Sequence, residues 1–130
     1  MYSKKILERF SNPAYAGGIR GGNGTGKVER ENEVAKIYLQ VDEDGTIKTA
    51  KFKAYGGVCT IAVCDVVCSL IEDGSLSDAL ALSEEDIVEE LGSIPANKQD
   101  SIAIALECVK LAVEDYYDKK EKELKKASKK

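Results

Sequence analysis

Two stretches of alternating side chains, joined by a turn, constrain the fold of this chain more than any other feature. From Val34 to Val41 apolar residues occupy every second position, and the same period returns from Ile47 to Tyr55. The intervening residues 42–45, Asp-Glu-Asp-Gly, form a turn sequence. Because side chains of a strand point alternately to opposite faces, the pattern predicts a β-hairpin with one buried face and one polar face.

Helical periodicity is found on both sides of this hairpin. Residues 60–73 are apolar except for a narrow polar stripe, Asp65, Ser69, Glu72 and Asp73, which predicts a mostly buried helix. Residues 2–10 form a short helical pattern that Ser-Asn-Pro ends. Residues 102–116 predict a long amphipathic helix.

The remaining segments complete an α+β plan. Ser75 and Ser83 each precede an aspartate by three residues, which predicts two short capped helices. Six glycines within residues 16–26 predict a flexible segment without an element of its own, and a less regular strand pattern follows at residues 27–30. We therefore expect a three-stranded antiparallel sheet packed on one side by helices.

Length and composition narrow the class of protein. The 130 residues suffice for one domain, and the net charge of −4 argues against nucleic acid as a partner. There is no run of eighteen apolar residues and no apolar leader, so we expect no membrane association, a cytoplasmic location and reduced thiols. The chain has no histidine, which excludes the common catalytic pairs; we expect no enzymatic turnover.

The last twelve residues differ in composition from the rest. Residues 119–130 contain seven lysines and two glutamates. We interpret them as a solvated tail, helical or disordered, that follows a domain of residues 1–118. Docking of a partner by this tail is the alternative.

The four cysteines fall into two groups. Cys64, Cys68 and Cys108 lie on apolar helix faces and are expected in the core, with an internal thiol cluster as the alternative and no disulfide assumed. Cys59 follows Gly56-Gly57 at the predicted start of a helix, where unpaired amides favour a thiolate. Burial as a small apolar side chain is the other interpretation of Cys59.

An ordered set of short strings resembles one family. These strings are FSNP at Phe10–Pro13 followed by Gly17, NGTG at Asn23–Gly26, FKAYG at Phe52–Gly56 and GSLSDA at Gly74–Ala79. Together they resemble the iron-sulfur cluster assembly scaffolds of the IscU type, which also form the amino-terminal domain of NifU. The resemblance spans about residues 2–117 and implies the α+β fold above. It also implies a cysteine desulfurase as partner and an iron-sulfur cluster as cargo.

This chain departs from that family where the cluster is held. The family uses three cysteines and an aspartate, with a histidine beside the last cysteine. The first string, Cys-Gly-Asp, corresponds here to residues 31–33, Glu-Asn-Glu, and the His-Cys pair corresponds to Gln99 and Asp100. The second cysteine corresponds to Gly57 or Val58, depending on the direction of counting.

The altered positions suggest an altered site. Glu31, Glu33, Cys59, Gln99 and Asp100 are our candidate metal ligands. Carboxylates with one thiolate suit an iron or zinc ion better than a cluster, and the departures equally allow that no metal is bound. The competing interpretation makes these carboxylates ordinary helix caps and solvated side chains. Cys59 is also our candidate acceptor of sulfur from the desulfurase.

Four functions are compatible with these residues. The first is a scaffold-like protein of iron or sulfur trafficking with an altered cluster site, and the second is a sulfur acceptor that acts through Cys59. The third is a regulatory partner of the desulfurase that binds no cluster. In the fourth, the fold serves unrelated ligand or protein binding. The resemblance favours the first function. Oligomeric state is not determined by these patterns.

Overall fold

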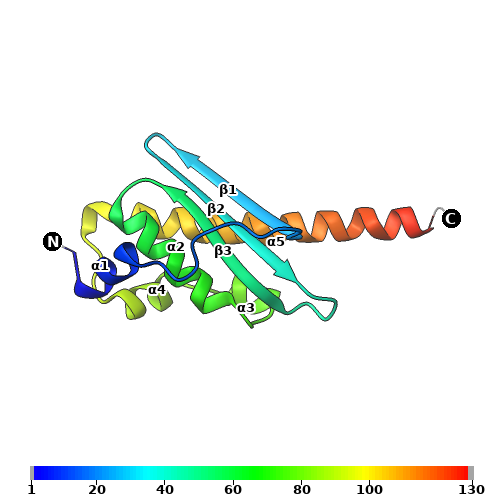
Figure 1. Cartoon of the computed structure of the whole chain (residues 1–130), viewed down its shortest axis with the longest axis horizontal. Coiled ribbons are helices and arrows are strands. Elements are labelled where there is room, and N and C mark those ends of the chain that lie inside the picture. The colour runs from blue at the N-terminus through cyan, green and yellow to red at the C-terminus, as the bar shows by residue number, and fades with distance from the viewer. Residues whose placement is uncertain (1, 129–130) are drawn as a thin grey trace.

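The structure is a computed structural model that describes residues 2–128 (Figure 1). Its elements, in chain order, are α1 (Lys4–Ser11), β1 (Gly24–Arg30), β2 (Glu33–Val41), β3 (Ile47–Tyr55), α2 (Val58–Ile71), α3 (Leu76–Leu80), α4 (Glu84–Leu91), a 3-10 turn η1 (Ala96–Lys98) and α5 (Asp100–Ser128). The predicted α+β class is confirmed.

The three strands form one antiparallel sheet in the order β1-β2-β3. Val28 of β1 lies opposite Ala35 of β2, and Ala35 lies opposite Ala54 of β3. The alternating apolar residues of β2, beginning with Ala35 and Ile37, are fully buried. The hairpin of β2 and β3 is therefore confirmed with the predicted face inward.

The helices cover that inward face (Figure 1). α2 packs on β3, and α5 packs on β1 and β2, while α1 and α4 pack on the outer side of α2. Most of α2 is buried, including Val63, Val66 and Val67 at 0% exposure. Its lack of a polar face agrees with a helix that is enclosed by the sheet on one side and by other helices on the other.

The glycine-rich segment was wrongly predicted to form no element. β1 begins inside it at Gly24, earlier than the predicted start at residue 27. At Gly26, a Cβ would lie 2.6 Å from the Ala112 backbone nitrogen and closer still to the Cys108 carbonyl oxygen. The backbones of β1 and α5 thus touch at a position that only glycine fits, and local periodicity could not reveal it.

Both predicted caps are present. The Ser75 and Ser83 hydroxyls accept hydrogen bonds from the backbone amides of Asp78 and Asp86. The Asp86 carboxylate in turn accepts a hydrogen bond from the Ser83 backbone amide, which completes a capping box. At the other end, α5 continues as a helix through Ser128, across the expected domain limit at residue 118. No helix within residues 2–128 is both long and apolar enough to cross a membrane.

Candidate functional site

A surface pocket of about 360 Å³ lies at one end of the sheet. The antiparallel pairing of Val34 with Tyr55 places the start of β2 beside the end of β3, and α2 begins directly after β3. The first turn of α5 closes the pocket. Its lining residues are Arg30, Glu31, Asn32, Glu33, Gly57, Cys59, Thr60, Asn97, Lys98, Asp100 and Ser101.

Four of the five candidate metal ligands line this pocket. They are Glu31, Glu33, Cys59 and Asp100, whereas Gln99 is exposed and is not among the lining residues. Among residues 2–128, no three carboxylate or thiol side chains lie close enough together to hold a metal ion. The pocket therefore gathers the predicted donors at one place, and the metal site stays a prediction.

Gly57 and Val58, the two positions that the resemblance aligns with the family's second cysteine, differ in their surroundings. Gly57 lines the pocket, while Val58 is half-buried against the core. A Cβ added at Gly57 would meet nothing within 4 Å, so a side chain at this position would extend into open space. Of the two positions, Gly57 is therefore the one from which a side chain would reach the pocket.

A chain of hydrogen bonds fixes one carboxylate in the wall of the pocket. The Thr60 hydroxyl donates to Oε1 of Glu33, and the Thr60 and Ser101 hydroxyl oxygens are 3.3 Å apart. Thr60 and Ser101 are 1% and 3% exposed. Sequence reasoning missed both hydroxyls because they interrupt apolar helix faces singly. Glu33 is consequently held, while Glu31 and Asp100 project from exposed positions.

Cys59 does not have the environment that its position suggested. Its side chain is only 2% exposed, and burial raises the pKa of the thiol, with Lys98 lowering the pKa and Glu33 raising it. The expected thiolate at a helix start is therefore not favoured, because the cost of burying the charge exceeds the effect of nearby positive charge. Its role as sulfur acceptor stays a prediction.

The other three cysteines are confirmed as core residues. Cys64, Cys68 and Cys108 are all 0% exposed and free of disulfides. Burial raises the pKa of Cys108 to about 12, and its thiol donates to the carbonyl oxygens of Gly26 and Ala35 at 3.2 and 3.4 Å. These thiols act as packing groups, and within the described chain they do not assemble as a metal-binding cluster.

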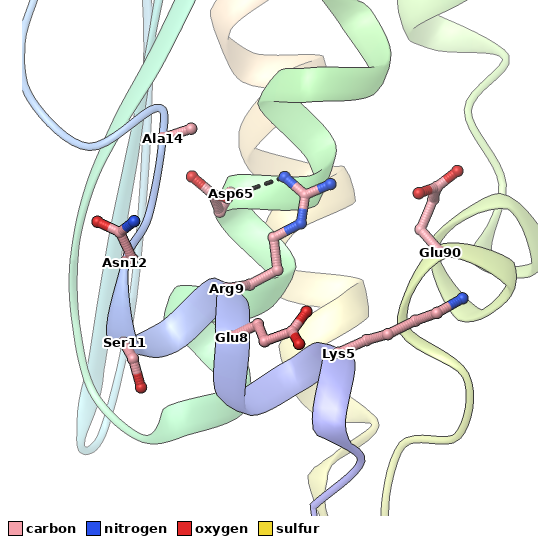
Figure 2. A pocket seen from close by; sticks show the side chains of 8 residues that line it. All are labelled: Lys5, Glu8, Arg9, Ser11, Asn12, Ala14, Asp65 and Glu90. Atoms are coloured by element: carbon pink, nitrogen blue, oxygen red, sulfur yellow. Dashed lines mark hydrogen bonds and ion pairs between the residues drawn. The ribbon is translucent and has the colours of Figure 1, made fainter.

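A second pocket, of about 640 Å³, lies where α1 meets α2 and α4 (Figure 2). At its base Asp65 of α2 accepts hydrogen bonds from Nη1 of Arg9 at 2.9 Å and from the backbone amide of Tyr15 at 2.8 Å. Asp65 is fully buried, so assigning it to a polar stripe together with Ser69 was incomplete. A lone acid among the eleven apolar residues of α2 was the available signal of a buried charged partner.

The fold and the pocket define a class, a small α+β domain with a polar pocket at the end of a three-stranded sheet. Residues 1–123 match the family model of the NifU-like N-terminal domain. Two similar relatives are iron-sulfur cluster assembly scaffold proteins named IscU. The one from Buchnera aphidicola subsp. Schizaphis graminum is 35% identical, with 93% of this chain and 98% of the relative covered. The one from Escherichia coli K12 is 33% identical, with 92% and 97% covered. The chain belongs to the NifU-like N-terminal domain family.

Solved structures agree on the fold. FiSufU from Fervidobacterium islandicum AW-1, ascribed to the SUF system of iron-sulfur cluster assembly, has a TM-score of 0.74 at 14% identity, with 86% of this chain and 96% of that chain covered. The N-terminal part of a nitrogen-fixing NifU-like protein from Brucella abortus has a TM-score of 0.71 at 13% identity, with 89% and 94% covered. At such identities these likenesses establish the fold alone.

Proposed function

We propose that this chain acts in iron-sulfur cluster assembly as a scaffold-family protein whose pocket takes iron(II) as cargo on carboxylates. The membership of the family supports the process, and the names of the IscU relatives support the scaffold role. The single observation that carries the altered chemistry is the pocket itself. Glu31, Gly57 and Asp100, the positions that the resemblance aligns with the three family cysteines when the second is counted forward from Tyr55-Gly56, line it together.

The donor set does not fit a cluster held by three thiolates. Iron-sulfur clusters are held chiefly by thiolate sulfur, and the one thiol in this pocket, Cys59, is buried with a raised pKa. Oxygen is the abundant donor instead, from Glu31, Glu33 and Asp100. Carboxylate oxygen suits a divalent ion, and the exposed Glu31 and Asp100 have the rotational freedom to turn toward one beside the fixed Glu33.

Iron binding is tested by anaerobic titration with iron(II), followed by iron counting on the desalted protein. We expect the unaltered chain to retain iron and the double variant Glu33→Gln with Asp100→Asn to lose it. Glu85→Gln with Glu89→Gln, two acids exposed on α4, is the control that removes the same charge. Equal iron in all three proteins would contradict a carboxylate site in this pocket.

Restoring the family thiols tests the missing cluster directly. After reconstitution with iron(II) and sulfide, we expect the unaltered chain to show no cluster absorbance. A triple variant, Glu31→Cys, Gly57→Cys and Asp100→Cys, should become coloured, because all three thiols would line one pocket and Gly57 has space for a side chain. A coloured cluster in the unaltered chain would refute the proposed exchange of thiolate for carboxylate.

The sulfur donor follows from the family resemblance. We infer a cysteine desulfurase as the partner, with Cys59 as the sulfur acceptor after local opening of the start of α2, because the thiol is 2% exposed in this structure. Mass spectrometry after incubation with a desulfurase and cysteine should find added sulfur on Cys59 and none in Cys59→Ser. Co-purification with the desulfurase should survive this substitution, which separates docking from transfer.

We also propose that the chain catalyses no reaction by itself and that it acts in the cytoplasm. The chain contains no histidine to act as a base, and burial raises the pKa of the one thiol in the pocket. The four free, buried cysteines suit a reducing compartment. Release of sulfur from cysteine by the chain alone, without a desulfurase and also in Cys59→Ser, would contradict the non-enzymatic role.

A further inference from the structure

The face of the sheet opposite the helices carries an unusual row of like charges. The strand register places Lys27 of β1 opposite Lys36 of β2, and Lys36 opposite Lys53 of β3. In the neighbouring row, Tyr38 lies opposite Lys51. Ala35 and Ile37, the neighbours of Lys36 on β2, are buried, so Lys36 points to the opposite face of the sheet. The register and the alternation along each strand place Lys27, Lys51 and Lys53 on that same face. We call Lys27, Lys36, Lys51 and Lys53 the lysine face.

Little within the described chain neutralises this charge. Glu29, next to Lys27 on β1, forms an ion pair with it. For Lys36, Lys51 and Lys53, the part of the chain that the structure describes, residues 2–128, provides no ion pair. Lys53 instead lies over the Tyr38 ring, with Nζ 5.9 Å from its centroid. The lysine face therefore stays positive on a chain whose net charge is −4.

Such a row is unfavourable for the sheet alone. Like charges on directly opposed positions of adjacent strands destabilise the pairing, and Lys36 faces a lysine on both sides. Lysine is also a weak strand former compared with the β-branched residues. The Lys27–Glu29 ion pair and the Lys53–Tyr38 contact offset part of this cost, but Lys36, in the middle of the row, has no ion pair within residues 2–128. A local cost that the chain leaves in place points to function outside the chain.

We propose that the lysine face is a docking surface for an acidic surface of a partner protein. Four ammonium groups with the aromatic rings of Tyr38 and the 76% exposed Tyr55 beside them offer both charge and apolar area. Aromatic rings surrounded by complementary charge are typical of protein interfaces. The surface is separate from the pocket at the sheet end, so the proposal stands independently of iron binding.

Charge distribution favours a protein over nucleic acid. Strands lie about 4.8 Å apart, so the row from Lys27 to Lys53 spans roughly 10 Å, close to one Debye length at physiological salt. A compact acidic patch can match that size. A long polyanion would extend beyond it, over a chain that is acidic overall.

The test uses the whole chain, labelled with nitrogen-15, and a capped oligoglutamate peptide as the probe. Amide shifts on titration at low salt should map to β1, β2 and β3. The double variant Lys36→Glu with Lys53→Glu should bind the peptide at least about tenfold more weakly. Lys122→Glu with Lys126→Glu, two exposed lysines of α5, makes the same change in net charge and should bind as the unaltered chain does. Should the reversed variant unfold, Lys36→Thr with Lys53→Thr replaces it.

The other results would overturn the proposal. If the amide shifts were confined to α5, or if both double variants bound the peptide equally weakly, the binding would be a non-specific attraction between the acidic peptide and exposed lysines. Tighter binding of a duplex DNA than of the peptide on the same strands would make the ligand a nucleic acid. Self-association that sedimentation detects and that Lys36→Glu with Lys53→Glu abolishes would make the occupant a second copy. Absence of any binding at low salt would leave the lysine face without a docking role.

Discussion

Replacement of Gly26 by alanine tests the closest contact in the fold. Gly26 lies in β1, where its backbone touches the backbone of α5. The added Cβ would lie 2.6 Å from the Ala112 nitrogen and nearer to the Cys108 carbonyl oxygen, whereas ordinary contacts begin at about 3.4 Å. Both neighbours are helix backbone, so neither can rotate away. The strand and the helix would have to separate by about 1 Å.

That separation sets the size of the effect. A gap of this width removes a quarter to a half of the attraction between packed atoms, and it would weaken the bonds from the Cys108 thiol to the carbonyl oxygens of Gly26 and Ala35. We expect a loss of about 3–5 kcal/mol in the free energy of unfolding. For a domain of this size, the loss corresponds to a fall of roughly 10–20 °C in Tm.

Urea unfolding followed by circular dichroism measures the change. Gly18→Ala is the matched control, because its Cβ would approach only the end of the flexible Lys53 side chain, at 3.4 Å. We expect the control to keep the stability of the unaltered chain. A loss below about 1 kcal/mol for Gly26→Ala would refute the backbone contact between β1 and α5.

Three further predictions concern charge and thiols. Burial raises the pKa of Asp115, but Lys119 and the Thr25 amide together lower it more, so the pKa lies below its usual value. The charged Asp115 carboxylate therefore stabilises the folded chain above about pH 4, and this contribution is lost as the pH falls further. Asp115→Asn should therefore lower the urea midpoint more at pH 7 than at pH 3, and an equal loss at both values would disprove the linkage. Native alkylation by iodoacetamide, read by mass spectrometry, should modify Cys59 first, since it lies at the pocket wall; earlier modification of a core cysteine would contradict the packing. Lys36→Thr should raise the free energy of unfolding by about 0.2–1 kcal/mol, and a decrease would show that the lysine row does not strain the sheet.

The sequence predicted the fold well because its main signals are local. Alternation over Val34–Val41 and Ile47–Tyr55 identifies a hairpin wherever it lies, since the period of a strand is a property of its own backbone. The serine caps Ser75 and Ser83 act within one turn, so they were found in the same way. The resemblance to the scaffold family, confirmed by the family match, added the connection between these elements.

The candidate site was predicted only in part. Counting from the family strings located Glu31, Glu33 and Asp100, and the structure gathers them at one pocket. Burial of Cys59 was one of two interpretations, and the sequence could not decide between them, because burial depends on segments that fold over this residue from elsewhere in the chain. The hydroxyl of Ser101 was missed for the same reason, since its neighbour Thr60 lies 41 positions away.

The sequence by itself thus determined the hairpin of β2 and β3 with its buried face, the existence of the helices and the altered family positions. Tertiary structure alone decided three features: glycine at the contact of β1 with α5, the burial of Asp65 against Arg9, and the alignment of Lys27, Lys36 and Lys53 in one row. The physical reason is that the periodicity of apolar residues shows which face of a helix or strand is buried. Close contacts and charge pairs depend on which distant residues meet it there, and Asp65 and Arg9 are 56 positions apart.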